Sequence, residues 1–149
     1  MFDIKIERII SAPIDKVFDA ISDHESYSNY NGITLAQVVE TGKLEKNGEG
    51  ALRQMGGSSI ELFERITKFQ RPSTMHYRIE RSKPFKIEHL KGEIRLFEQG
   101  EKTKVVWESS GRVHIALIGK LMDKQLEKNS ARLFGSILKG IDHALSQAT

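Results

Sequence analysis

The chain has 149 residues, which suits one domain with one hydrophobic core, so residues 1–149 are expected to form a single unit. The formal net charge is only +3, and basic residues are interleaved with acidic ones, which argues against a nucleic-acid partner. The absence of cysteine excludes disulfides, thiol nucleophiles and thiolate metal sites. The N-terminus has no apolar core of signal-peptide length and no segment is apolar enough to span a bilayer, so we expect a cytoplasmic protein without integral membrane association.

A strand and two short helices are expected at the start of the chain. The strand is indicated by apolar residues that alternate with charged ones, namely Phe2, Ile4 and Ile6. Ser11, Pro13 and Asp15 then favour a helix start, where small polar caps, an early proline and an acid near the positive helix end are typical. A second short helix or turn is expected from Glu25 to Tyr30, ending at Asn31-Gly32.

From Thr34 the apolar pattern changes to the two-residue period of a β-strand. Six strands are expected between glycine and proline breaks, over residues 35–41, 50–55, 60–69, 74–81, 87–97 and 103–113. One hairpin is expected across Gly56-Gly57-Ser58-Ser59 and another across Gln99-Gly100. The chain has no internal repeat, linker or low-complexity stretch, which also favours one domain.

The last third of the chain predicts one long amphipathic helix. At 100° per residue, one broad stripe contains Ile115, Ile118, Met122, Leu126, Asn129, Leu133, Ile137, Ile141 and Ala144. The opposite side contains Lys120, Lys124, Lys128, Arg132, Lys139 and His143. Such a helix is too polar on one side to be buried and too apolar on the other to stand alone. We therefore expect it to lie against the sheet, with a hollow between the two.

This order of elements resembles the START-like (SRPBCC) superfamily, and most closely its polyketide cyclase/dehydrase branch of small bacterial proteins. The resemblance is carried by residues 9–18 (IISAPIDKVF), by residues 64–67 (ERIT) followed by Pro72, and by residues 92–96 (GEIRL) leading into 103–107 (TKVVW). It implies an α+β helix-grip fold, in which a curved antiparallel sheet of about seven strands wraps around the long C-terminal helix, with two short helices after the first strand. It also implies a cavity for an apolar or aromatic ligand, but no single reaction.

Counting back from each hairpin predicts which strand residues face that cavity. A turn centred on Gly57-Ser58 would pair Arg53 with Leu62, which makes Glu64 a diagonal neighbour of Arg53 on the same inner face.

The second hairpin gives the inner face of the last two strands. A two-residue turn at Gln99-Gly100 would place Gly92 opposite Trp107. The same alternation places His76 and His89 on the outer face. Because no histidines are spaced as metal ligands, we expect no metal site and no cofactor.

The expected cavity residues are Met55, Leu62, Glu64, Met75, Tyr77, Leu90, Trp107, Ser109, Met122, Asn129 and Leu133. The resemblance implies an entrance where Tyr27 and Tyr30 meet the N-terminal part of the long helix. Tyr77 and Trp107 are as consistent with packed core residues as with cavity lining. The amide of Asn129 would need a hydrogen-bond partner at a buried position, which a backbone group, a water or a ligand could provide.

Catalytic motifs are absent from the sequence. It contains no HExxH, no Gly-x-Ser-x-Gly elbow, no phosphate loop and no dinucleotide fingerprint. Glu64 or Glu88 could act as a general acid or base if burial raised its pKa. Glu64 and Arg53 are the candidate catalytic residues, although a structural ion pair is the favoured interpretation of the two.

We therefore expect the domain to bind, carry or sequester a small hydrophobic molecule, either lipid-like or aromatic. The resemblance leaves a polyketide cyclase/dehydrase-type enzyme acting on an aromatic substrate as the main alternative. A second alternative is a protein-interaction module. The chain is expected to be a monomer or a homodimer.

Overall fold

The computed structural model describes residues 1–57 and 60–147. The elements are β1 (Phe2–Ile10), α1 (Ile14–Ser22), the 3-10 helix η1 (His24–Asn29), β2 (Leu35–Glu40), β3 (Leu52–Gly56), β4 (Glu61–Gln70), β5 (Thr74–Lys83), β6 (Lys86–Gln99), β7 (Lys102–His114) and α2 (Gly119–Gln147). The predicted α+β helix-grip fold is confirmed, and each predicted element is present within a few residues of its expected bounds. Within the described ranges, no helix is both long and apolar enough to cross a membrane.

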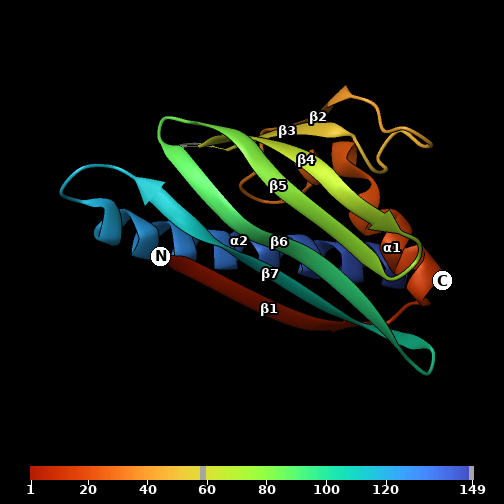
Figure 1. The fold of residues 1–149 in the computed structure, drawn as a ribbon. Helices are drawn as coiled ribbons and strands as arrows, with labels where there is room; N and C mark the ends of the chain where they lie inside the picture. Colours follow the sequence, from red (N-terminus) through yellow and green to blue (C-terminus); the bar gives the residue numbers. More distant parts are fainter. Residues whose placement is uncertain (58–59, 148–149) are drawn as a thin grey trace.

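The seven strands form one antiparallel sheet in the order β1-β7-β6-β5-β4-β3-β2. Figure 1 shows the sheet curving past α2, which lies along one of its faces, with α1 next to the C-terminal end of α2. The first strand therefore pairs with the last, and the chain closes around the long helix. The pairing of β1 with β7 places Ile6 opposite Trp107.

The buried side of α2 differs from the predicted stripe. Its buried residues are Asp123, Phe134, Ile137, Leu138 and Ile141. Ile118, Asn129 and Ala144 were expected on the apolar stripe, but all three are exposed. The C-terminal half of α2 turns Phe134 toward the sheet, where its ring stacks on Trp107 with 4.2 Å between the ring centroids. The buried side of α2 is therefore rotated relative to the predicted apolar stripe, which did not include Phe134.

Both predicted hairpin registers are displaced by two residues. Arg53 pairs with Glu64 directly, not diagonally, and Gly92 lies opposite Ser109, not opposite Trp107. The first difference arises because Gly56 pairs with Glu61, so the hairpin is centred one residue farther along the chain than predicted. Residues Ser58 and Ser59 of the predicted turn lie outside the described residues. A shift of two keeps every side chain on its predicted face.

A bulge in β6 reverses the predicted positions of two neighbouring residues. The pairing with β7 shifts between His89 and Lys91, so that Leu90 is the extra residue. Leu90 is consequently 53% exposed, and the prediction that it lines the cavity is wrong. His89, which was expected on the outer face, is buried.

Candidate functional site

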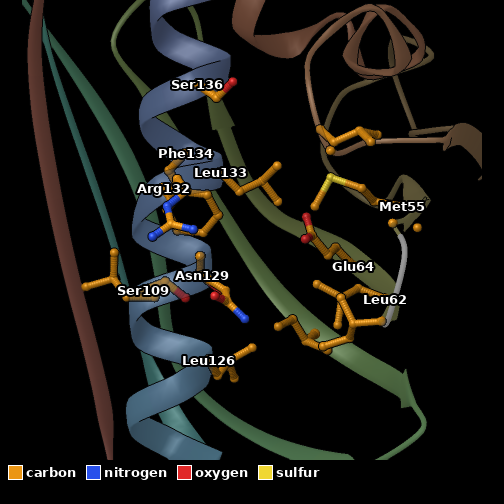
Figure 2. Close-up of a pocket in the computed structure, with 18 of the residues that line it drawn as sticks. Met55, Leu62, Glu64, Ser109, Leu126, Asn129, Arg132, Leu133, Phe134 and Ser136 are labelled. Atoms are coloured by element: carbon orange, nitrogen blue, oxygen red, sulfur yellow. The ribbon is translucent and has the colours of Figure 1, made fainter.

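A pocket of about 500 Å³ lies between α2 and the inner face of the sheet. Figure 2 shows residues from both walls facing the same space. The predicted residues that line it are Met55, Leu62, Glu64, Tyr77, Ser109, Asn129 and Leu133. They come from β3, β4, β5, β7 and α2, so the pocket is built by elements far apart in the sequence.

Four predicted residues lie elsewhere. Met75 and Trp107 are buried in the core, and Met122 packs against the core without lining the pocket. Trp107 is covered by the ring of Phe134, which is the residue that actually faces the pocket at this position. Leu90 points outward because of the bulge.

The predicted entrance residues are also packed. Tyr27 is buried, and its hydroxyl donates a hydrogen bond to the carbonyl oxygen of Ile21 over 2.5 Å. Tyr30 is half-buried and lies so close to Gly140, in the C-terminal half of α2, that a Cβ there would clash with its ring. Neither tyrosine lines the pocket, whereas the segment that follows them, 31–33, does.

The sequence-based reasoning missed Arg132 and Phe134, which both line the pocket. Arg132 was assigned to the polar side of α2, and Phe134 to neither side. A usable signal was present for Phe134, because Phe134 and Leu138 lie four residues apart beside the predicted stripe and continue at helical spacing into Ile141, which belongs to it. Nothing in the sequence marks Arg132 as different from the lysines of the same helix.

A chain of hydrogen bonds runs behind the inner wall of the sheet. The backbone N–H of Ile79 donates to Nδ1 of His89 over 3.1 Å, and Nε2 of His89 lies 2.9 Å from Oγ of Ser109. Because Nδ1 accepts a hydrogen bond, Nε2 of the neutral ring carries the proton and donates a hydrogen bond to Oγ of Ser109. Burial lowers the pKa of His89 to about 4, which keeps the ring neutral near pH 7.

Tyr77, whose ring stacks on that of His89, lines the pocket. Nε1 of Trp107 donates a hydrogen bond to the Tyr77 hydroxyl oxygen over 2.8 Å. Because this oxygen accepts, the hydroxyl proton of Tyr77 can be donated elsewhere. Burial and the nearby Glu64 raise the pKa of Tyr77, so that proton is retained.

Arg53 and Glu64 form a buried ion pair on the facing strands β3 and β4. Nη2 of Arg53 lies 3.6 Å from Oε2 of Glu64, and their side chains are 2% and 8% exposed. Figure 2 shows the Glu64 carboxyl group pointing from β4 into the space beside α2. Burial raises the pKa of Glu64, and the charge of Arg53 opposes that shift. Both residues face inward, as predicted.

Glu88, the second acid considered as a general acid or base, does not line the pocket, and the histidines form no metal-binding cluster in the described residues. Glu88 lies at the surface and pairs with His114 over 2.8 Å, so the prediction of a pocket acid there is wrong. It sits on the outer face because the bulge at Leu90 exchanges the faces of the β6 residues that precede it. Among residues 1–57 and 60–147, no cluster of three or more histidine or acidic side chains could hold a metal ion.

Solved structures share this fold over nearly the full chain. TTHA0849 from Thermus thermophilus superposes with a TM-score of 0.81 at 20% identity, and the alignment covers 99% of both chains. A START superfamily protein from Mycobacterium smegmatis has a TM-score of 0.77 at 12% identity, covering 97% of this chain and 99% of that one. The Zhui aromatase/cyclase from a Streptomyces species has a TM-score of 0.74 at 16% identity, covering 96% and 94%. The comparison with curated protein sequences gave no match.

The sequence itself matches a family model over residues 1–140, and that family is described as polyketide cyclase / dehydrase and lipid transport. The match covers almost all of the chain and includes every strand and most of α2. The START superfamily protein and the aromatase/cyclase among the similar structures share the same helix-grip architecture. The chain therefore belongs to the polyketide cyclase / dehydrase and lipid transport family.

Proposed function

We propose that the protein binds a small hydrophobic molecule in the pocket between α2 and the sheet, and carries or sequesters it. The observation that carries this proposal is the pocket itself. Its volume of about 500 Å³ lies within the range of pockets that hold small organic ligands. Its walls are mainly apolar, with contributions from Ile4, Leu62, Ile79, Leu126 and Leu133.

The polar groups of the pocket restrict the ligand further. Tyr77 has a hydroxyl proton to donate, and the carboxyl group of Glu64 faces the same pocket. Buried polar groups are costly without partners, so a ligand that hydrogen-bonds with them is favoured over a pure hydrocarbon. The proposed ligand is a flat or elongated apolar molecule with one or two hydrogen-bonding groups.

Native mass spectrometry of freshly purified protein tests this proposal by detecting a ligand that co-purifies. Titration with a fatty acid, a flavonoid and a quinone tests it in parallel, because the only tryptophan, Trp107, stacks on the pocket residue Phe134 and should change its emission on binding. Tyr77→Phe should weaken binding, while Tyr30→Phe, at a half-buried phenol outside the pocket, should not. A flat titration with every class and no co-purified mass would favour the protein-interaction module instead.

An enzyme acting on an aromatic or polyketide-like substrate is the second candidate, and the raised pKa of Glu64 is the observation that favours it. A carboxyl group that is protonated more readily than usual, inside an apolar pocket and near the Tyr77 hydroxyl, has the properties of a general acid or base. Glu64→Gln should then abolish turnover of such a substrate and leave its binding intact. Turnover that survives Glu64→Gln would exclude this role for Glu64.

A further inference from the structure

The mouth of the pocket can be located from exposure. The pocket-lining residues that are also exposed to solvent are Asn31, Gly32, Asn129 and Arg132. They belong to the segment between η1 and β2 and to the middle of α2, which face each other across the opening. Ser136 continues the α2 side of the rim, because positions 129, 132 and 136 lie on successive turns along one edge of the helix (Figure 2).

Arg132 gives this mouth a positive charge. Glu64 is the other charged residue that lines the pocket, and it is paired with the buried Arg53 of the neighbouring strand β3. Arg132, in contrast, makes no ion pair with any residue in the described part of the chain. Within the described residues, five of the other eight arginines form ion pairs with acidic side chains, as Arg65 does with Glu80.

Asn129 adds a hydrogen-bond donor one turn away. Its Oδ1 accepts a hydrogen bond from Nε2 of Gln125 over 3.3 Å, which leaves the amide N–H₂ group as the free end of the side chain. The rim of α2 therefore presents a guanidinium and an amide nitrogen, both donors, beside an apolar interior. This combination is complementary to an anionic oxygen group and not to a cation.

We infer that the ligand is an amphipathic anion, whose apolar body fills the pocket and whose terminal carboxylate or phosphate monoester is held at the mouth by Arg132. This inference rests on the proposed function and specifies the class of ligand. A guanidinium presents parallel N–H donors that match two oxygens of either group. The charged head remains in contact with water at the mouth, so binding does not require a full loss of its hydration.

Three probes with the same twelve-carbon chain test the inference: dodecanoate, dodecyl phosphate and 1-dodecanol, titrated below their aggregation limits at fixed ionic strength. Binding is read from Trp107 emission. The wild-type protein is expected to bind at least one anion about tenfold more tightly than the alcohol. The anion that binds more tightly identifies the preferred head group.

The variant Arg132→Gln should reduce that preference to near unity, because it should weaken binding of the anions far more than binding of 1-dodecanol. Lys128→Gln is the matched control, because Lys128 is also exposed on α2 and the substitution removes the same charge, but Lys128 does not line the pocket. It should preserve the preference. Higher salt should weaken binding of the anions in the wild-type protein more than in Arg132→Gln.

Equal affinity of the wild-type protein for all three probes would overturn the inference and leave pocket binding intact. Equal losses in Arg132→Gln and Lys128→Gln would overturn it as well, since the effect would then be one of overall charge. If none of the three probes binds, the inference fails, and the flavonoid and quinone titrations decide separately whether the proposed function stands.

Discussion

Glu64 lines the pocket and forms an ion pair with the buried Arg53, so the stability of each charge depends on the other. Removing one partner of a buried pair leaves an uncompensated charge, which typically costs about 3–5 kcal/mol of unfolding free energy. Arg53→Met is therefore expected to destabilise strongly, and the double variant Arg53→Met/Glu64→Leu less than the sum of the single variants. Urea denaturation of the four proteins in this cycle measures the coupling.

The exposed pair Lys43–Glu49 provides the control for that cycle. Its charged groups are 4.0 Å apart, and both side chains are more than half exposed. Such pairs contribute little to stability, so the same cycle on Lys43 and Glu49 should give almost no coupling. Additive effects at Arg53 and Glu64 would show that the pair is not energetically linked.

Two buried histidines make stability depend on pH. Burial lowers the pKa of His89 from 6.5 to about 4, with a further contribution from Arg78, and lowers that of His24 to about 3. Below pH 6.5 these histidines bind protons in the unfolded chain but remain neutral in the folded protein until the pH approaches their lowered pKa values. The stability they provide is complete above pH 6.5 and is lost progressively as the pH falls toward 4. Each histidine contributes a slope of up to about 1.4 kcal/mol per pH unit in that window.

His89→Gln should reduce this acid slope, even though the variant also loses hydrogen bonds to Ile79 and Ser109 at pH 7. The exposed His143→Gln should leave the slope as it is in the wild-type protein. The measurement is the unfolding free energy from urea denaturation at steps between pH 7.5 and pH 4.5. Identical slopes in all three proteins would show that His89 does not control the acid response.

At the scale of elements, different residues of α2 pack in the core and line the pocket. Ile137, Leu138 and Ile141 in its C-terminal half are buried in the core, whereas Leu126 and Leu133 line the pocket. Phe134 belongs to both groups, because it is buried and also lines the pocket. Leu138→Ala should therefore cost about 2–5 kcal/mol, because the side chain is fully buried. Leu133→Ala should cost less, since Leu133 is only half-buried.

The exposed Leu121 on the same helix is the control for this series. Leu121→Ala removes the same atoms from a side chain that is 66% exposed, so the urea midpoint should change little. The expected order of destabilisation is Leu138, then Leu133, then Leu121. If Leu133→Ala destabilised the protein more than Leu138→Ala, the result would support the helix orientation predicted from the sequence pattern.

The sequence predicts element types and strand faces well because those depend on local periodicity. Arg53, Glu64 and Ser109 were assigned to the inner face correctly, although their hairpin registers were wrong, since a displacement of two residues does not exchange the faces of a strand. The positions of His89 and Leu90 could not be predicted in this way. A one-residue bulge exchanges the faces of a strand, and here His89 accepts a hydrogen bond from Ile79 and forms another with Ser109, residues that lie 10 and 20 positions away in the sequence.

At the scale of the whole molecule, the pocket lies where two central strands separate. The pairing of β5 with β6 covers only Thr74–His76 and Glu93–Arg95. Farther along, the imidazole of His89 replaces a backbone partner by accepting the N–H of Ile79. Ile79 and Ile87 line the pocket on these two separating strands. The bulge, the buried histidine and the pocket are therefore parts of the same local departure from a regular sheet.

If a ligand fills this space, it should stabilise the whole domain. A ligand that binds only the folded state at 100 times its dissociation constant adds about 2.7 kcal/mol to the unfolding free energy. Leu126→Phe places a larger side chain into the pocket, so it should leave the unliganded protein folded but reduce the thermal shift produced by dodecanoate or a co-purified ligand. Leu121→Phe adds the same ring at an exposed position of α2 and should retain the full shift. Equal shifts in both variants, measured by thermal unfolding at matched ligand concentration, would place the ligand outside the space between α2 and the sheet.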